Sequence, residues 1–129
     1  MKPLKYCIQE HHTTHLHYDL RLELDGVAKS WAIPKEPTME EGVKRLAVQV
    51  EDHRIDYMDF EGEIEEGYGK GKVEIWDKGF WEPESVKEKK IVAIIHGKKL
   101  NGRFTLVNFK EKNWLFFKAK EKEFTPTCA

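Results

Sequence analysis

Histidine residues are concentrated near the start of the chain, directly before a stretch in which apolar and polar residues alternate. Four of the six histidines fall there: His11, His12, His15 and His17. In residues 16–24 every even position is apolar and every odd position is polar, a pattern that predicts a β-strand. Side chains two positions apart share one face of a strand, so we expect His17, Asp19 and Arg21 to lie in a row.

This row would present an imidazole, a carboxylate and a guanidinium together. Either His11 or His12, folding back beside the strand, would complete a set of two histidines and one carboxylate, which binds divalent metal ions and leaves coordination positions open. The planar fork of Arg21 suits phosphate oxygens, so the chemistry indicated is cleavage of a phosphoryl or phosphodiester bond. The alternative is an ordinary solvated strand face with exposed ion pairs between Asp19 and Arg21. The clustering of the histidines favours the metal site.

A second group of candidate residues follows the next alternating run, at Leu46, Val48 and Val50. His53 stands at the end of this predicted strand, where it would serve as a further phosphate ligand or a proton donor, helped by Tyr57. The alternative is a surface loop that an ordinary tyrosine anchors.

Residues 67–72 are rich in glycine and lysine, but they lack the spacing and the Ser or Thr of a nucleoside-triphosphate-binding loop. A tight turn between strands is the better interpretation, with Tyr68 as a stacking surface for a base. Lys35 and Arg45 are further cations near strand ends, and such residues are more often solvated than bound to a ligand.

The remaining pattern is that of many short strands with turns between them. Asp25 and Gly26 predict a hairpin turn between residues 16–24 and a strand over 27–33. Further strands are predicted at residues 73–76, 91–95, 103–109 and 114–119, with a turn at 77–79. Thr38 and Glu41 have capping-box spacing and predict a short helix that Gly42 limits. The pattern indicates a mostly β barrel or sandwich with one or two short helices.

Composition restricts both the fold and the partners. The 129 residues fit one domain, residues 1–129, with a tail that frays from about residue 121. The net charge of -1 argues against a protein that coats nucleic acid through bulk positive charge. The two cysteines suggest neither a disulfide framework nor a zinc cluster. Without an apolar leader or a long apolar run, the expected location is the cytoplasm, with no membrane contact.

Residues 9–26, from Gln9 to Gly26, closely resemble the opening motif of the 3′-phosphoesterase domain of bacterial DNA ligase D. Further segments resemble the same family in the same order: residues 29–35, 44–48, 50–53, 56–57, 60–62 and 76–79. The resemblance covers nearly the whole chain, and a series of spaced motifs is more specific than any single one.

The resemblance implies a single-domain β-barrel of short antiparallel strands and an end-healing hydrolase that prefers Mn²⁺; Co²⁺ or Zn²⁺ are other ions that such a site binds. It places His11, His17 and Asp19 as metal ligands, Arg21 and His53 on the scissile phosphate, and Tyr57 beside them. Beyond these residues, the candidates for further substrate contacts are Gln9, Lys35, Arg45 and Tyr68.

The implied activity removes a 3′-terminal ribonucleoside and then hydrolyses the remaining 3′-phosphate to a 3′-hydroxyl, as repair by non-homologous end joining requires. The expected partners are nucleic-acid 3′ ends, including primer-templates with 3′ ribonucleotides, and a separate DNA ligase. Two features depart from the family. The loop at residues 65–71 lacks the Gln that usually precedes Tyr68, and the chain carries no ligase or polymerase domain.

Two other functions compete with this interpretation. One is a general nucleotide phosphatase or cyclic phosphodiesterase that uses the same metal site on small substrates. The other is a non-catalytic barrel that binds single-stranded nucleic acid through aromatic surfaces, for which the candidates are Trp31, Trp76, Trp81 and Tyr68.

Overall fold

The computed structural model describes residues 3–67 and 70–120. Within these ranges the chain forms nine β-strands and one 3-10 helix, in the order β1 (Leu4–His12), β2 (His17–Leu24), β3 (Val27–Ile33), β4 (Arg45–His53), η1 (Ile55–Asp59), β5 (Gly62–Ile64), β6 (Gly71–Lys87), β7 (Lys90–Gly97), β8 (Asn101–Lys110) and β9 (Asn113–Lys118). No helix in the described ranges is long and apolar enough to cross a bilayer.

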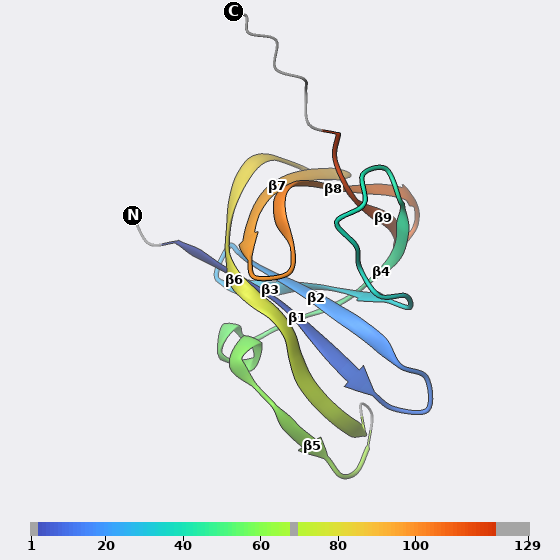
Figure 1. Ribbon diagram of the computed structural model, residues 1–129. Coiled ribbons are helices and arrows are strands. Elements are labelled where there is room, and N and C mark those ends of the chain that lie inside the picture. The colour runs from blue at the N-terminus through green and yellow to red at the C-terminus, as the bar shows by residue number, and fades with distance from the viewer. Residues whose placement is uncertain (1–2, 68–69, 121–129) are drawn as a thin grey trace, which may run out of the picture.

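Eight of the strands close into an antiparallel barrel in the order β1-β2-β3-β4-β9-β8-β7-β6, and pairing between β1 and β6 closes the ring (Figure 1). Among the described residues, the short strand β5 pairs with the start of β6 alone, at residues 71–73. Closure removes the unpaired edges that an open sheet would present. The predicted mostly β barrel is therefore confirmed.

The alternation in residues 16–24 separates the two faces of β2 as predicted. Leu20 and Leu22 point into the barrel, where they join a core that includes Trp31, Trp81 and Phe104. The turn that follows β2 has positive φ at both Asp25 and Gly26, 55° and 81°, as a two-residue hairpin turn of type I′ requires. The hairpin fixes the register in which β2 and β3 pair.

The predicted turn at residues 77–79 is wrong, because these residues continue β6 without a break. Asp77 is buried, and its carboxylate accepts hydrogen bonds from the Tyr6 hydroxyl and from the backbone N–H groups of Lys98, Lys99 and Leu100. Gly79 allows β6 and β7 to approach closely, since a Cβ there would lie 1.9 Å from the carbonyl oxygen of His96. Asp and Gly are typical of turns, but here Asp77 binds the turn between β7 and β8, and Gly79 lets β7 approach β6.

The helix predicted from Thr38 is also wrong. The Thr38 hydroxyl accepts a hydrogen bond from the Glu40 N–H at 3.1 Å, which closes a local turn in place of a helix cap. Glu41 then forms an isolated bridge with Lys118, and Gly42 has a φ of 78°. Contact with β9 decides the path of this segment, which local spacing could not reveal.

Candidate metal and phosphate site

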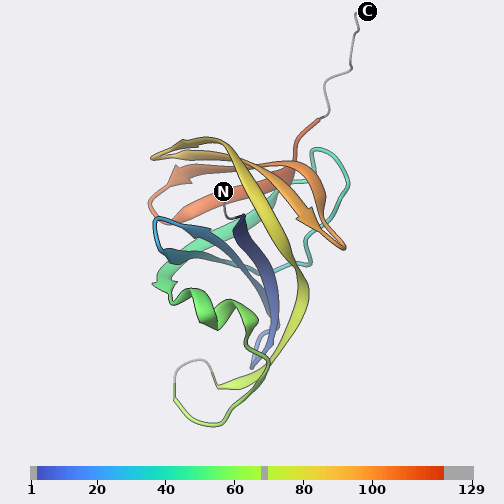
Figure 2. The same cartoon turned by 90° about the vertical axis from the view of Figure 1, so that its left-hand side faces the viewer.

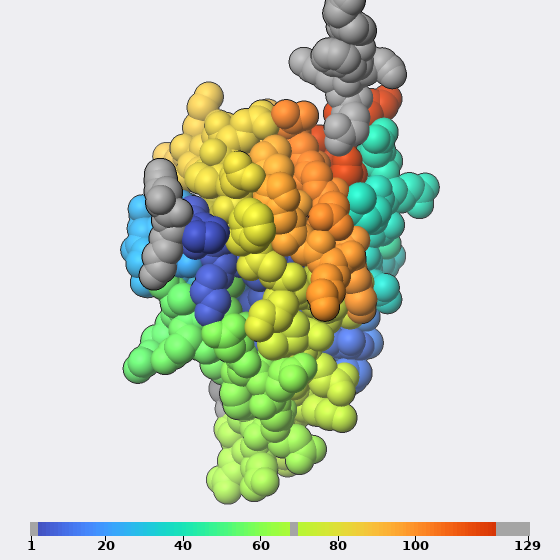
Figure 3. Space-filling model, turned by 60° about the vertical axis from the view of Figure 1, so that its left-hand side comes forward, coloured from blue at the N-terminus to red at the C-terminus, as the bar shows by residue number. Residues whose placement is uncertain are grey.

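The site lies on the outer face of the barrel, where η1 packs against strands β1 and β3 (Figure 2). Met58 of η1 packs on Cys7 and Ala28, and these three residues form a small core separate from the one inside the barrel. Burial raises the pKa of the Cys7 thiol to about 12, so this cysteine is a packing residue rather than a nucleophile. The segment carrying η1 and β5 forms a lobe below the barrel (Figure 3).

This cover explains why the outer face of β2 is not the solvated surface that the alternative interpretation required. The exposed fraction is 7% for Asp19 and 3% for Arg21. Charged groups are rarely buried to this degree unless they are paired or serve a function. The pairing of β1 with β2 sets His11 opposite His17 and Gln9 opposite Asp19, and thereby assembles the candidate site.

His11, His17 and Asp19 form a cluster whose ligand atoms all lie within 4.8 Å of one another. His11 Nδ1 is 3.6 Å from Asp19 Oδ2, and His17 Nε2 is 3.3 Å from Asp19 Oδ1. Ligands about 2.1 Å from a tetrahedral metal ion lie about 3.4 Å apart. The separations therefore fit a metal ion held by two imidazoles and a carboxylate.

His17 is oriented by its other ring nitrogen. Nδ1 lies 3.2 Å from the carbonyl oxygen of His15, to which it donates, so that Nε2 faces Asp19. Such a backbone contact fixes the tautomer of a metal-binding histidine. The hydrogen bond with the Asp19 carboxylate is the main reason that the pKa of His17 is raised above 6.5. A proton and a metal ion would compete for Nε2.

Arg21 is held in place on three sides. Its Nε donates to Gln9 Oε1 at 2.5 Å, and its Nη1 donates to Ser30 Oγ at 2.7 Å and lies 3.1 Å from His53 Nδ1. Nη2 is 3.7 Å from Asp19 Oδ2. The guanidinium is thus fixed directly beside the cluster of His11, His17 and Asp19, which we call the metal-type cluster. Because Arg21 is buried, its charge interacts more strongly with neighbouring charges than it would in water.

Two of these partners bear on the sequence predictions. Gln9, predicted as a substrate contact, is completely buried, and besides Arg21 it binds the carbonyl oxygens of Tyr57 and Phe60 in and after η1. Ser30 was missed by the sequence analysis. The hairpin turn at Asp25 and Gly26 could have revealed it, because counting back from that turn pairs Arg21 with Ser30.

His53 ends β4 and brings an imidazole to Arg21. Its pKa is lowered below 6.5, first by burial and then by the charge of Arg21, so the neutral ring is favoured. Nδ1 lies 3.1 Å from both Arg21 Nη1 and the Glu51 carbonyl oxygen. It can serve only one of them at a time: when it accepts from Arg21, the proton of the neutral ring is on Nε2.

Tyr57 of η1 lies against Arg21 and His53. Its ring lies 5.0 Å from the Arg21 guanidinium carbon and 5.1 Å from the His53 ring, and it stacks on Phe60 at 5.2 Å. Burial raises the pKa of the Tyr57 hydroxyl, so it stays protonated as a hydrogen-bond donor. The structure thus places Tyr57 in contact with Arg21 and His53, the two residues predicted to bind the phosphate.

The other predicted substrate contacts are not part of this arrangement. Lys35 is exposed after β3, and Arg45 donates to the carbonyl oxygen of Glu36 at 2.8 Å. Within the described ranges neither residue makes a hydrogen bond to the metal-type cluster or to Arg21. Tyr68 lies outside the described residues.

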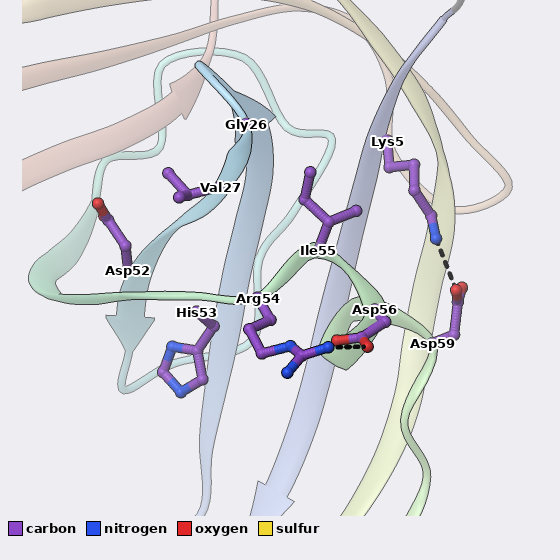
Figure 4. Close-up of a pocket in the computed structure, with 9 residues that line it drawn as sticks. All are labelled: Lys5, Gly26, Val27, Asp52, His53, Arg54, Ile55, Asp56 and Asp59. Carbon is purple, nitrogen blue, oxygen red and sulfur yellow. Dashed lines mark hydrogen bonds and ion pairs between the residues drawn. The ribbon is translucent and has the colours of Figure 1, made fainter.

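An open hollow of about 660 Å³ borders His53 (Figure 4). Its lining combines the β2–β3 turn, the start of η1 and Lys5 of β1. Ion pairs join Lys5 to Asp59 and Arg54 to Asp56 across its rim. Of the candidate site residues, His53 belongs to this lining, whereas Arg21 and the cluster of His11, His17 and Asp19 do not.

Comparison with known proteins gives a consistent result. The family described as the DNA ligase D 3′-phosphoesterase domain matches residues 9–108. The chain is 48% identical over 130 residues to the multifunctional non-homologous end joining protein LigD of Pseudomonas aeruginosa, covering 93% of this chain and 16% of the relative. It is 43% identical to the LigD protein of Mycolicibacterium smegmatis and 40% identical to that of Mycobacterium tuberculosis, covering 92% of this chain in each case. The chain spans only 16% or 17% of the length of these relatives.

Proposed function

Because the chain belongs to the family of DNA ligase D 3′-phosphoesterase domains, we propose that it is a metal-dependent phosphoesterase that heals nucleic-acid 3′ ends. It removes a 3′-terminal ribonucleoside and then hydrolyses the 3′-phosphate, leaving a 3′-hydroxyl. The observation that carries this proposal is the position of Arg21 and His53 directly beside the cluster of His11, His17 and Asp19.

The donor set fits a divalent metal ion. Two imidazole nitrogens and a carboxylate oxygen suit first-row transition metals, and the separations between these atoms match those of ligands around one ion. We propose Mn²⁺ for this site, as the resemblance described above implies, with Co²⁺ or Zn²⁺ as ions that the same donors accept. A metal ion there would supply Lewis-acid polarisation of a phosphate oxygen.

The chain's own residues have distinct tasks in both reactions. Arg21, fixed by Gln9 and Ser30, binds phosphate oxygens through its remaining N–H groups and offsets the charge that develops on them. His53, in the tautomer that accepts from Arg21, directs its Nε2 proton toward the phosphate or the leaving oxygen. Both steps then act on one bound phosphorus centre.

The relatives support a role in end joining. They are described as multifunctional non-homologous end joining proteins, and a healed 3′-hydroxyl is the end that ligation needs. The partners we propose are therefore DNA 3′ ends, including ends that carry ribonucleotides, and a DNA ligase that acts on the product.

The non-catalytic binding barrel is disfavoured by the structure. Trp31 and Trp81 are each 1% exposed and belong to the core inside the barrel, so neither ring is available to stack on a base. Trp76 is partly buried against the same core and lies under Lys99.

The test is to incubate the protein with a labelled DNA primer-template that ends in one ribonucleotide, with and without Mn²⁺. We expect metal-dependent shortening to a 3′-phosphate, followed by conversion to a 3′-hydroxyl. Faster hydrolysis of mononucleotides or cyclic nucleotides than of the primer would instead identify a small-molecule phosphatase. Stable binding without cleavage in every divalent metal would overturn the enzymatic proposal.

A further inference from the structure

A second group of metal-ligating side chains lies on the opposite face of β1. Residues alternate along a strand, so Glu10 and His12 point away from the face that carries Gln9 and His11. Glu74 of β6 is paired directly with Glu10. The ligand atoms of Glu10, His12 and Glu74 all lie within 4.8 Å of one another.

The separations within this group fit ligands of one metal ion as well as ion pairs. His12 Nε2 is 3.4 Å from Glu10 Oε2 and 3.6 Å from Glu74 Oε1, too far for good hydrogen bonds but close to the separation of about 3.4 Å between ligands of a tetrahedral ion. The imidazole thus faces two carboxylates with a gap that a metal ion fits.

The negative charges of Glu10 and Glu74 also favour a bound cation. Like charges directly opposite each other on antiparallel strands are destabilising, and Glu10 and Glu74 are such a pair. Lys72 offsets the charge of Glu74, with its Nζ 3.2 Å from Glu74 Oε2.

We propose that Glu10, His12 and Glu74 form a second divalent-cation site, distinct from the cluster of His11, His17 and Asp19. One imidazole and two carboxylates suit a first-row transition ion such as Zn²⁺. An ion there ties the end of β1 to β6, just before the turn that leads to His17. Gly71 packs against the same end, since a Cβ on it would meet the carbonyl oxygen of His12 at 2.1 Å.

The experiment counts Zn²⁺ bound per chain, by equilibrium dialysis and metal analysis. A Cys128→Ser background keeps the second thiol of the sequence out of the count. We expect His12→Ala and His17→Ala each to bind one ion fewer than the parent, and the double variant to bind two fewer. Glu74→Gln repeats the His12→Ala result with a milder change, and circular dichroism verifies that each variant is folded.

His96→Ala is the matched control. His96 has nearly the same side-chain exposure as His12, 39% against 41%, and its Nε2 lies 2.6 Å from Glu82, but it faces a single carboxylate. It should bind as much Zn²⁺ as the parent. The proposal is overturned if His12→Ala and Glu74→Gln retain the parent's count. Because the readout is bound metal, this result is independent of whether the protein hydrolyses any 3′ end.

Discussion

Arg21 is the residue on which the candidate site most depends. Its guanidinium is almost fully buried, and Gln9, Ser30 and His53 fix its orientation before any substrate binds. A cation that is held in this way needs no reorganisation when charge develops on a phosphate. Burying the Arg21 charge is unfavourable. The contacts with these three residues and with the nearby Asp19 offset this desolvation penalty.

Arg21→Lys should therefore be nearly inactive although it conserves the charge. A lysine ammonium is a point charge that cannot reach Gln9, Ser30 and a phosphate together, so we expect hydrolysis of a 3′-phosphate to slow by about 100-fold or more. Steady-state rates of the two proteins provide the measurement. Arg103→Lys, on β8 and paired with Glu84, should keep the parental rate. If Arg21→Lys hydrolyses the 3′-phosphate as fast as the parent, the role assigned to the planar guanidinium of Arg21 is wrong.

Metal affinity at the His11, His17 and Asp19 cluster should depend on pH through His17. Asp19 raises the pKa of His17 above 6.5, and a metal ion needs the unprotonated Nε2. The affinity for the metal ion should therefore be highest above the raised pKa of His17. It should fall as the pH decreases through that pKa, and the decrease should begin at a pH above 6.5. Calorimetric titration with Mn²⁺ between about pH 8 and about pH 5.5 would measure this effect. An affinity that stays constant over this range would refute it.

At the scale of the elements, local pattern predicted most of the strands but not how distant segments meet. The alternation at residues 16–24 and the turn at Asp25 and Gly26 are local signals, and both were right. The continuation of β6 through Asp77 and the loss of the helix at Thr38 depend on contacts with β7–β8 and β9. The cover of the site by η1 is likewise a long-range contact, so no local pattern could predict that Asp19 and Arg21 are buried.

Gly79→Ala should destabilise the barrel more than Gly26→Ala. A methyl group at Gly79 would lie 1.9 Å from the His96 carbonyl oxygen and force β6 from β7, whereas a Cβ at Gly26 meets nothing within 4 Å. We expect a loss of about 3 kcal/mol in the free energy of unfolding for the first and about 1 kcal/mol, from the positive φ alone, for the second. Urea denaturation of both variants gives the comparison. Equal losses of unfolding free energy in the two variants would mean that the close approach of β6 and β7 at Gly79 does not contribute to stability.

At the scale of the whole molecule, the site and the main core occupy opposite faces of the same strands. The inner face of β2 carries Leu20 and Leu22, and the outer face carries Asp19 and Arg21. With a net charge of -1, the surface has no general attraction for DNA. Recognition of a 3′ end must therefore depend on a few local contacts.

Binding to a 3′-phosphorylated primer should accordingly depend only weakly on salt. Each phosphate contact adds about -0.9 to the slope of log affinity against log salt concentration, so two or three contacts give a slope of about -2 to -3. Fluorescence anisotropy in the presence of a chelator, which prevents turnover, would measure it. A slope of about -6 or steeper would indicate an extended DNA-binding surface that this account does not contain.

The central claim is that the metal-type cluster and the Arg21–His53 pair act on one phosphorus centre. Its most direct test is the rate of phosphate release from a 3′-phosphorylated DNA primer in Mn²⁺, compared among the parent, His17→Ala, Arg21→Ala and the control His96→Ala. The account predicts rapid release by the parent and His96→Ala, and a loss of about 100-fold or more in each of the other two variants. Folded His17→Ala and Arg21→Ala proteins that release phosphate at the parental rate would contradict it.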